Sequence, residues 1–369
     1  MFKKINREKS GNLKKWAAVF WPFVLALFVF LGTRLAIKNP AFVEDVYSEK
    51  IYPLIARLFS SVSRHIPFSI WDAFWAITIL LIIAGLILVI IKKMKPGRYF
   101  LRISQFLVLL YSIFYFLWGF NYFRPGIETR IGWEIPGTDM KIFRSALDTI
   151  IISAGLNRVA MTDSDYQSID RKVEESFQKN SKRLGINYPN GTRRPKTMIF
   201  SSFVAKVGVT GYFGPFFNEI NLNRYVFPLD YPFTLAHEKA HQFGVASEAE
   251  ANLMGFIICT TSDDARLRYS GYINVLLYFL SDARRQRMDK EFLMKIDKQV
   301  IKDLQLRRKY YADLQRERLS EMQSAANNAY LKSNHIKTGV RNYNQVVALI
   351  LSYYYNIGPS KKQEIKSGF

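Results

Sequence analysis

One segment of the chain carries the pattern HExxH among apolar neighbours: Thr234-Leu235-Ala236-His237-Glu238-Lys239-Ala240-His241-Gln242-Phe243-Gly244. On a helix, His237 and His241 lie four residues apart on one face, so both imidazoles can bind one Zn²⁺. Glu238 is rotated off that line and can act as the catalytic general base that accepts a proton from water. Gly244 breaks the helix three residues after His241. We therefore expect a short metal-binding helix from about residue 232 to 243.

The third ligand should come from the residues that follow the glycine. Ser247 is a good N-cap, which predicts a second helix over 248–260. On that helix Glu248 can bind zinc while Asn252, four residues later, reaches back to hold a histidine. Glu250 points about 160° away from Glu248 and is the alternative third ligand. A further alternative is that both glutamates are solvated first-turn residues favoured by the helix dipole.

Three apolar segments near the N-terminus are long enough to cross a membrane, which takes about 20 residues of helix. They cover residues 16–37, 70–91 and 103–123. Trp118, Tyr122 and Phe123 end the third segment with the aromatic residues typical of a membrane interface. We therefore expect a membrane anchor over 1–126 and one domain over 127–369.

The distribution of charge predicts how the chain is oriented. The chain has 52 Lys and Arg against 30 Asp and Glu, a net charge of +22. Basic residues gather in the N-terminal tail and in the connector at 92–102, and positive residues resist translocation. We expect a multi-pass protein of the cell membrane with a cytoplasmic N-terminus and an extracytoplasmic domain. The charge then favours contact with membrane lipid rather than nucleic acid; the oligomeric state stays unknown.

Beyond residue 126 the pattern favours an α+β fold, mostly helical with a small β-sheet. Tyr166, Ile169, Val173 and Phe177 recur at helical spacing and predict a helix over 163–184. Strands are expected at 197–200, 207–210 and 219–222. Long helices are expected at 265–286, 290–333 and 343–355. A few strands followed mainly by helices argue against a doubly wound sheet.

The run from His237 to Asn252 resembles the zincin metallopeptidases. Its ending Glu-x-x-Ala-Asn is similar to the gluzincin Glu-x-x-Ala-Asp signature, although Asn252 replaces the aspartate and the gap after His241 is shorter. Gly244 resembles the metzincin turn, but Ser247 stands where metzincins have a third histidine. The resemblance implies a zinc peptidase.

Most of the chain is similar to an uncharacterised family of bacterial membrane proteins with three N-terminal transmembrane helices. The motifs that carry this resemblance are Pro-Phe-Phe-Asn-Glu at 215–219, Tyr-Ser-Gly-Tyr at 269–272 and Asn-Asn-Ala-Tyr-Leu-Lys at 327–332. It implies no substrate.

Three other side chains are candidates for contact with a substrate. Glu219 precedes the HExxH helix, where zincins have an edge strand that receives the substrate; it could contact substrate or metal, or be an ordinary exposed strand residue. Tyr269 and Tyr272 could donate a hydrogen bond to a developing oxyanion, or pack in the core. The basic residues between Arg307 and Arg318 are expected on a solvated or lipid-facing surface.

The sequence thus predicts a membrane-anchored zinc metallopeptidase that hydrolyses peptide or protein substrates. One alternative is a membrane sensor or scaffold without catalysis, in which zinc serves structure or ligand binding. Glu238 separates the two, because a structural site needs no carboxylate base. The other alternative is an amidase acting on cell-wall peptides, which differs only in substrate.

Overall fold

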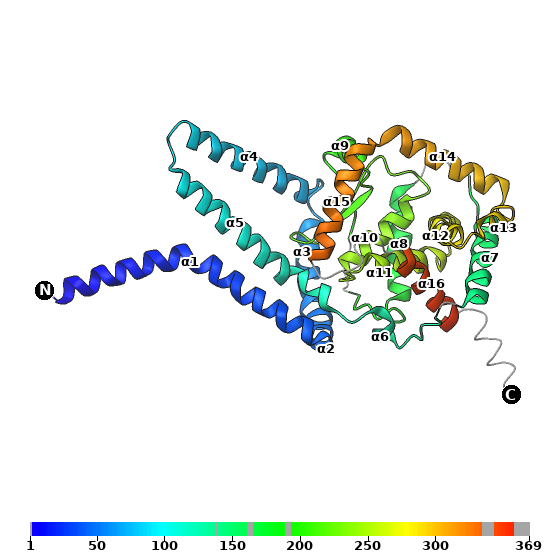
Figure 1. The fold of residues 1–369 in the computed structure, drawn as a ribbon, viewed down its shortest axis with the longest axis horizontal. Helices are drawn as coiled ribbons and strands as arrows, with labels where there is room; N and C mark the ends of the chain where they lie inside the picture. The colour runs from blue at the N-terminus through cyan, green and yellow to red at the C-terminus, as the bar shows by residue number, and fades with distance from the viewer. Residues whose placement is uncertain (1, 138, 161–164, 189–192, 334–342, 358–369) are drawn as a thin grey trace. The chain divides into compact units, whose positions relative to one another are not determined.

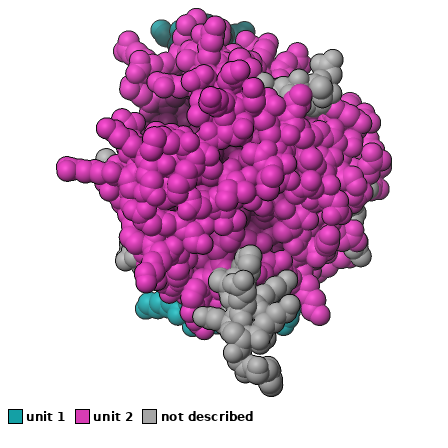
Figure 2. All heavy atoms as spheres, turned by 90° about the vertical axis from the view of Figure 1, so that its right-hand side faces the viewer, with its two compact units in different colours: residues 1–52, 71–124 teal, residues 53–70, 125–369 magenta. Residues whose placement is uncertain are grey.

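The structure is a computed structural model, and it describes residues 2–137, 139–160, 165–188, 193–333 and 343–357. The chain divides into two compact units, which Figure 2 colours separately. The first consists of residues 1–52 and 71–124, and the second of residues 53–70 and 125–369. Residues 53–70, which the sequence places with the anchor, group with the second unit.

The first unit contains three helices that are long and apolar enough to cross a membrane: Ala17–Lys38, Ile70–Ile90 and Pro96–Leu117. Its elements are α1 (Phe2–Lys38), α2 (Pro40–Phe42), the π-helix η1 (Val43–Ile51), α4 (Ile70–Ile90), α5 (Pro96–Leu117) and the 3₁₀-helix η2 (Gly119–Phe123) (Figure 1). These spans indicate a multi-pass membrane protein. The third expected span was placed too late, because Pro96 starts the helix and the expected end forms η2. Proline suits a first helical turn, where its missing N–H is not needed.

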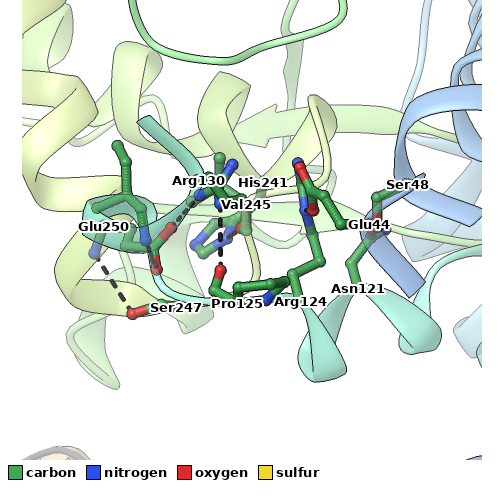
Figure 3. Close-up of polar contacts among 11 residues, drawn as sticks. Glu44, Ser48, Asn121, Arg124, Pro125, Arg130, His241, Val245, Ser247 and Glu250 are labelled. Carbon is green, nitrogen blue, oxygen red and sulfur yellow. Dashed lines mark hydrogen bonds and ion pairs between the residues drawn. The ribbon is translucent and has the colours of Figure 1, made fainter. Parts of the chain in front are cut away.

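A buried polar pair joins η1 to the residue after η2 in the first unit. Arg124 donates from Nε and Nη2 to the two oxygens of Glu44, at 2.6 Å each (Figure 3). Ser48 donates to Asn121 at 2.8 Å. Both side chains of the ion pair are about one-tenth exposed. Because breaking a buried pair leaves an uncompensated charge, these contacts hold the two short helices together.

The second unit is mostly helical. Its helices are α3 (Tyr52–Ser63), α6 (Ile127–Ile131), α7 (Met140–Leu156), α8 (Tyr166–Asn180), α9 (Ser201–Lys206), α10 (Tyr231–Gln242), α11 (Glu248–Thr260), α12 (Ala265–Arg285), α13 (Asp289–Leu293), α14 (Lys298–Leu314), α15 (Glu317–Ser333) and α16 (Tyr343–Ile357). Helices α10, α11, α12 and α16 agree with the expected ranges. The α+β class, with few strands and many helices, is confirmed.

A three-stranded sheet lies beside α10, with strand order β1-β3-β2. The strands are β1 (Lys196–Thr197), β2 (Gly211–Gly214) and β3 (Glu219–Leu222). β3 pairs parallel with β1 and antiparallel with β2. The third expected strand is confirmed, the first is shortened, and the second was placed too early. Its expected residues include a turn at Gly208, where φ is +89°, so pairing starts only at Gly211.

Two expected helices have different bounds in the structure. The helix expected over 163–184 starts at Tyr166, after the N-cap Asp165, and ends at Asn180; Asp163 lies outside the described residues. The long helix expected over 290–333 is three helices, α13, α14 and α15. Asp297 accepts hydrogen bonds from the backbone N–H groups of Gln299 and Val300, which starts α14 as a new helix.

Helix α10 lies at the centre of the second unit. It packs against α8, α11, α12 and the strands β2 and β3. Its core side chains Leu235, Ala236 and Ala240 are fully buried. This packing fixes the helix that carries HExxH between the sheet and α11.

Candidate metal centre

The end of α10 is built by Gly244 in a left-handed conformation, with φ of +83°. The N–H of Gly244 donates to the carbonyl of His241 at 3.0 Å, and the N–H of Val245 donates to that of Ala240 at 3.0 Å. This pair of bonds is the Schellman arrangement, which glycine forms without steric cost. It turns the chain back at once, so that α11 can lie beside α10.

The same turn orients His241. The carbonyl oxygen of Val245 lies 2.7 Å from Nδ1 of His241. Figure 3 labels both residues. A carbonyl can only accept, so Nδ1 of His241 donates this hydrogen bond, and Nε2 is the ring nitrogen that can bind a cation once it has lost its proton.

His237 is oriented by a residue of the second helix. Its Nδ1 lies 3.1 Å from Oδ1 of Asn252 on α11. This is the contact that the sequence predicts for Asn252. An acceptor at Nδ1 again leaves Nε2 free for a metal, so both histidines present the same ring atom.

Three potential ligand atoms converge at this point. Nε2 of His237 lies 3.2 Å from Nε2 of His241, and Oε2 of Glu248 lies 3.2 Å and 3.7 Å from the two nitrogens. Ligands of a tetrahedral zinc at its usual bond lengths lie about 3.3 Å apart. His237, His241 and Glu248 thus form a group that could hold a metal ion. Two imidazoles and a carboxylate are the donors of a hydrolytic zinc site.

Charge within the group shifts two pKa values. Burial lowers the pKa of His241, but the charge of Glu248 and its hydrogen bond outweigh burial and raise the pKa to about 9. Burial raises the pKa of Glu248, and the two histidines reverse this and hold it well below its usual range. The carboxylate therefore stays ionised, as a metal ligand must.

Glu250, the alternative third ligand, is used elsewhere. Its Oε2 accepts from Nη2 of Arg130 at 2.5 Å, and its Oε1 accepts from the N–H of Ile127 at 3.2 Å. Figure 3 shows this carboxylate facing Arg130, which lies on α6. The N–H of Glu250 also donates to the N-cap Ser247 at 3.4 Å. Each glutamate has its own partners; the side chain of Glu250 is 12% exposed, whereas that of Glu248 is 35% exposed and stays in contact with water.

Glu238 lies beside the group and against the edge strand β2. Burial raises the pKa of this carboxyl, while the two histidines and a hydrogen bond from the backbone of Phe213 oppose the rise. Gly211 makes room for the side chain, since a Cβ there would stand 2.9 Å from Cγ and Oε1 of Glu238. Real Cβ atoms essentially never come that close, so any other residue at position 211 would have to displace the Glu238 side chain.

A cavity of about 330 Å³ opens onto this group. His237, Glu238 and Asn252 line one side of it. The cavity is also lined by Asp230, Arg307 and Tyr311. Of these three residues, only Arg307 is expected from the sequence to have a particular place, on a solvated or lipid-facing surface. That expectation is wrong for Arg307, whose Nε donates to Oδ2 of Asp230 at 2.7 Å. Its neighbours Arg308, Lys309, Arg316 and Arg318 are exposed, as expected.

One sequence signal could have found Arg307. Tyr311 follows it by four residues, so the two share one face of α14. An aromatic residue at that spacing is typical of a helix face that packs against the protein rather than one that meets water. The partner Asp230 is remote in sequence and carries no such signal.

The other predicted candidates lie outside this group. Tyr269 is fully buried and donates to Asp303 at 2.6 Å, and Tyr272 packs against Phe256. Tyr269 therefore lies in the core and Tyr272 is half-buried against it, as the packing alternative expects. Glu219 is only 2% exposed, and its Oε2 accepts from Lys196 at 2.5 Å. The expectation of an exposed strand residue is wrong, because an ion pair with β1 brings the carboxylate inside.

Lys239, between the two histidines in sequence, joins α10 to α8. It is fully buried and donates to Glu174 and, at 3.1 Å, to the carbonyl of Arg193. Glu174 also accepts from Arg193 at 2.8 Å. Burial raises the pKa of Glu174, but the charges of Lys239 and Arg193 outweigh it and lower the pKa. This ion-pair cluster ties the back of α10 to α8.

The fold and the site together define a membrane-associated protein with three candidate spans and a His-His-Glu group, in which the HExxH helix α10 carries both histidines and α11 carries the glutamate. The chain belongs to the family described as "Protein of unknown function (DUF3810)", whose model matches residues 47–351. No curated protein and no solved structure matches the chain.

Proposed function

We propose that the protein is a zinc-dependent peptidase of the cell membrane. The observation that carries this proposal is the convergence of His237, His241 and Glu248, with His237 and the neighbouring Glu238 lining one cavity. When bound, zinc supplies a Lewis acid that brings the pKa of a coordinated water close to neutral. Glu238 accepts the proton of the attacking water and returns it to the leaving amine.

Peptide is the proposed substrate because β2 is an edge strand next to Glu238. β2 is an outer strand in the sheet order β1-β3-β2. An extended peptide can pair with such an edge through its backbone, which places a peptide bond near the catalytic carboxylate. A cell-wall peptide would bind in the same way, so an amidase shares this geometry.

The orientation is part of the proposal. The basic residues of the N-terminal tail and of the connector between the second and third spans favour an extracytoplasmic second unit. We propose that the membrane anchor reaches to residue 126. Reporter fusions after Gly126 should be active only outside the cytoplasm, and a cytoplasmic signal would overturn this orientation.

The test that separates a peptidase from a scaffold is Glu238→Gln in the full-length protein. This change keeps the size of the side chain and removes the base. Zinc content should stay at one per chain, while hydrolysis of a peptide library falls by about 10²–10⁴. Glu250→Gln serves as the matched control, because it changes a glutamate outside the proposed ligand group. Full activity in Glu238→Gln would make the scaffold the better description.

A further inference from the structure

The cavity beside the metal group contains one cationic side chain of α14. Arg307 lines it together with His237 and Glu238. Its side chain is 22% exposed, whereas that of its partner Asp230 is 5% exposed. The guanidinium is therefore the accessible part of the pair, and the carboxylate is the buried part.

Asp230 and its neighbours hold the guanidinium in one orientation. Nε of Arg307 donates to Oδ2 of Asp230 at 2.7 Å, and Nη2 donates to Oδ1 of Asn274 at 3.2 Å. The hydroxyl of Tyr311 donates to the same Oδ2 at 2.8 Å and accepts from the N–H of Phe227 at 3.1 Å. A planar guanidinium fixed at two nitrogens cannot turn, so the direction of the third is set.

The third nitrogen of the guanidinium is available to a ligand. Among the residues that the structure describes, none accepts a hydrogen bond from Nη1 of Arg307. A fixed guanidinium with a spare donor favours an anionic oxygen, because charge-assisted bonds are stronger than neutral ones.

We propose that Arg307 binds a carboxylate of the substrate and so selects peptides with a carboxylate next to the scissile bond. The inference rests on the proposed function. The cavity volume of about 330 Å³ lies at the lower end of the range for small-ligand pockets, about 300–1,000 Å³, so a bound ligand fills most of it. Because His237 and Arg307 line the same small cavity, a ligand that fills it contacts both. The carboxylate is either the C-terminus of the peptide or the side chain of Asp or Glu.

A binding experiment tests Arg307 without any hydrolysis. The probes are ω-mercaptoalkanoates of increasing chain length and the matching uncharged amides, with full-length zinc-loaded protein in detergent. The thiolate of either probe binds zinc, so the two differ only at the far end. The best acid should bind about 10- to 100-fold more tightly than its amide, as a charge-assisted hydrogen bond predicts.

The variant Arg307→Gln should remove this difference while the amide binds as before. Arg307→Lys keeps the charge and should retain part of the preference, which guards against a general loss of structure. The matched control is Arg158→Gln, which breaks the 2.9 Å ion pair of Arg158 with Asp303, also on α14 but outside the cavity lining. An unchanged preference in Arg307→Gln would overturn the inference.

Peptide turnover distinguishes the two sources of the carboxylate. Three matched peptides are compared: one with a free C-terminus, one with a C-terminal amide, and one with an amide end and an internal glutamate. Preference for the first supports a C-terminal carboxylate, and preference for the third supports a side chain. Equal turnover of all three contradicts the inference but leaves the peptidase intact. If no peptide is hydrolysed, the proposed function fails, and thiol binding alone decides the role of Arg307.

Discussion

The cavity has two sides that arise from the sequence in different ways. The first, which we call the local side, is the metal group of His237, His241 and Glu248, through which His237 lines the cavity; these residues come from two adjacent helices within one segment of the chain. The second, which we call the distant side, contains Asp230 and Arg307, which lie 77 positions apart in the sequence. The local side follows from helical spacing and one tight turn. The distant side depends on where α14 packs, and α14 is reached only after α12 and α13. Changes on one side should therefore leave the other intact.

The largest effect should come from removing both histidines. In the double variant His237→Ala, His241→Ala, two of the three proposed ligands are gone, so zinc should fall from one per chain to none. Elemental analysis of the purified full-length protein measures this. Arg307→Gln, on the distant side, should keep its zinc. Unchanged metal in the double variant would show that the metal is bound elsewhere.

The second prediction concerns the buried ion-pair cluster of Lys239, Glu174 and Arg193, which joins α10 to α8. Glu174→Gln leaves the buried charges of Lys239 and Arg193 without a carboxylate, and should lower the free energy of unfolding by about 3–5 kcal/mol. The shift of the unfolding transition measures it. Glu175→Gln is the control, because its pair with Lys172 is exposed and should contribute less than about 1 kcal/mol. Similar losses in both variants would argue against a special role of the buried cluster.

The pH dependence of that cluster has a definite sign. The folded-state pKa of Glu174 is lowered, although burial alone would raise it, because Lys239 and Arg193 outweigh burial. Its stabilisation is therefore complete above the ordinary carboxyl pKa and is lost as the pH falls through the lowered folded-state value. The difference in stability between the wild type and Glu174→Gln should shrink at acidic pH.

The smallest effect should come from Asn252→Ala. The side chain orients His237 without being one of the proposed ligands, so zinc should bind about 10- to 100-fold more weakly, as for other residues that hold a metal-binding histidine. Competition with a chelator measures the affinity. Asn252→Asp is the matched comparison, since it keeps an acceptor oxygen at the same place and should lose less. Equal affinity in all three proteins would mean that Val245 and the helix alone orient the site.

The sequence by itself determined the presence of three candidate spans, the α+β class, the helices α10 and α11, and the contact of Asn252 with a histidine. These features depend on apolar length, helical spacing, the Gly244 turn and the Ser247 cap, all of which act within a few residues. Only the tertiary structure decided what depends on distant partners. It joined Glu250 to Arg130, brought Glu219 inside against Lys196, and moved Tyr269 into the core against Asp303. It also turned Arg307 toward Asp230. A buried charge must lie next to the group that neutralises it, and that group can come from any part of the chain.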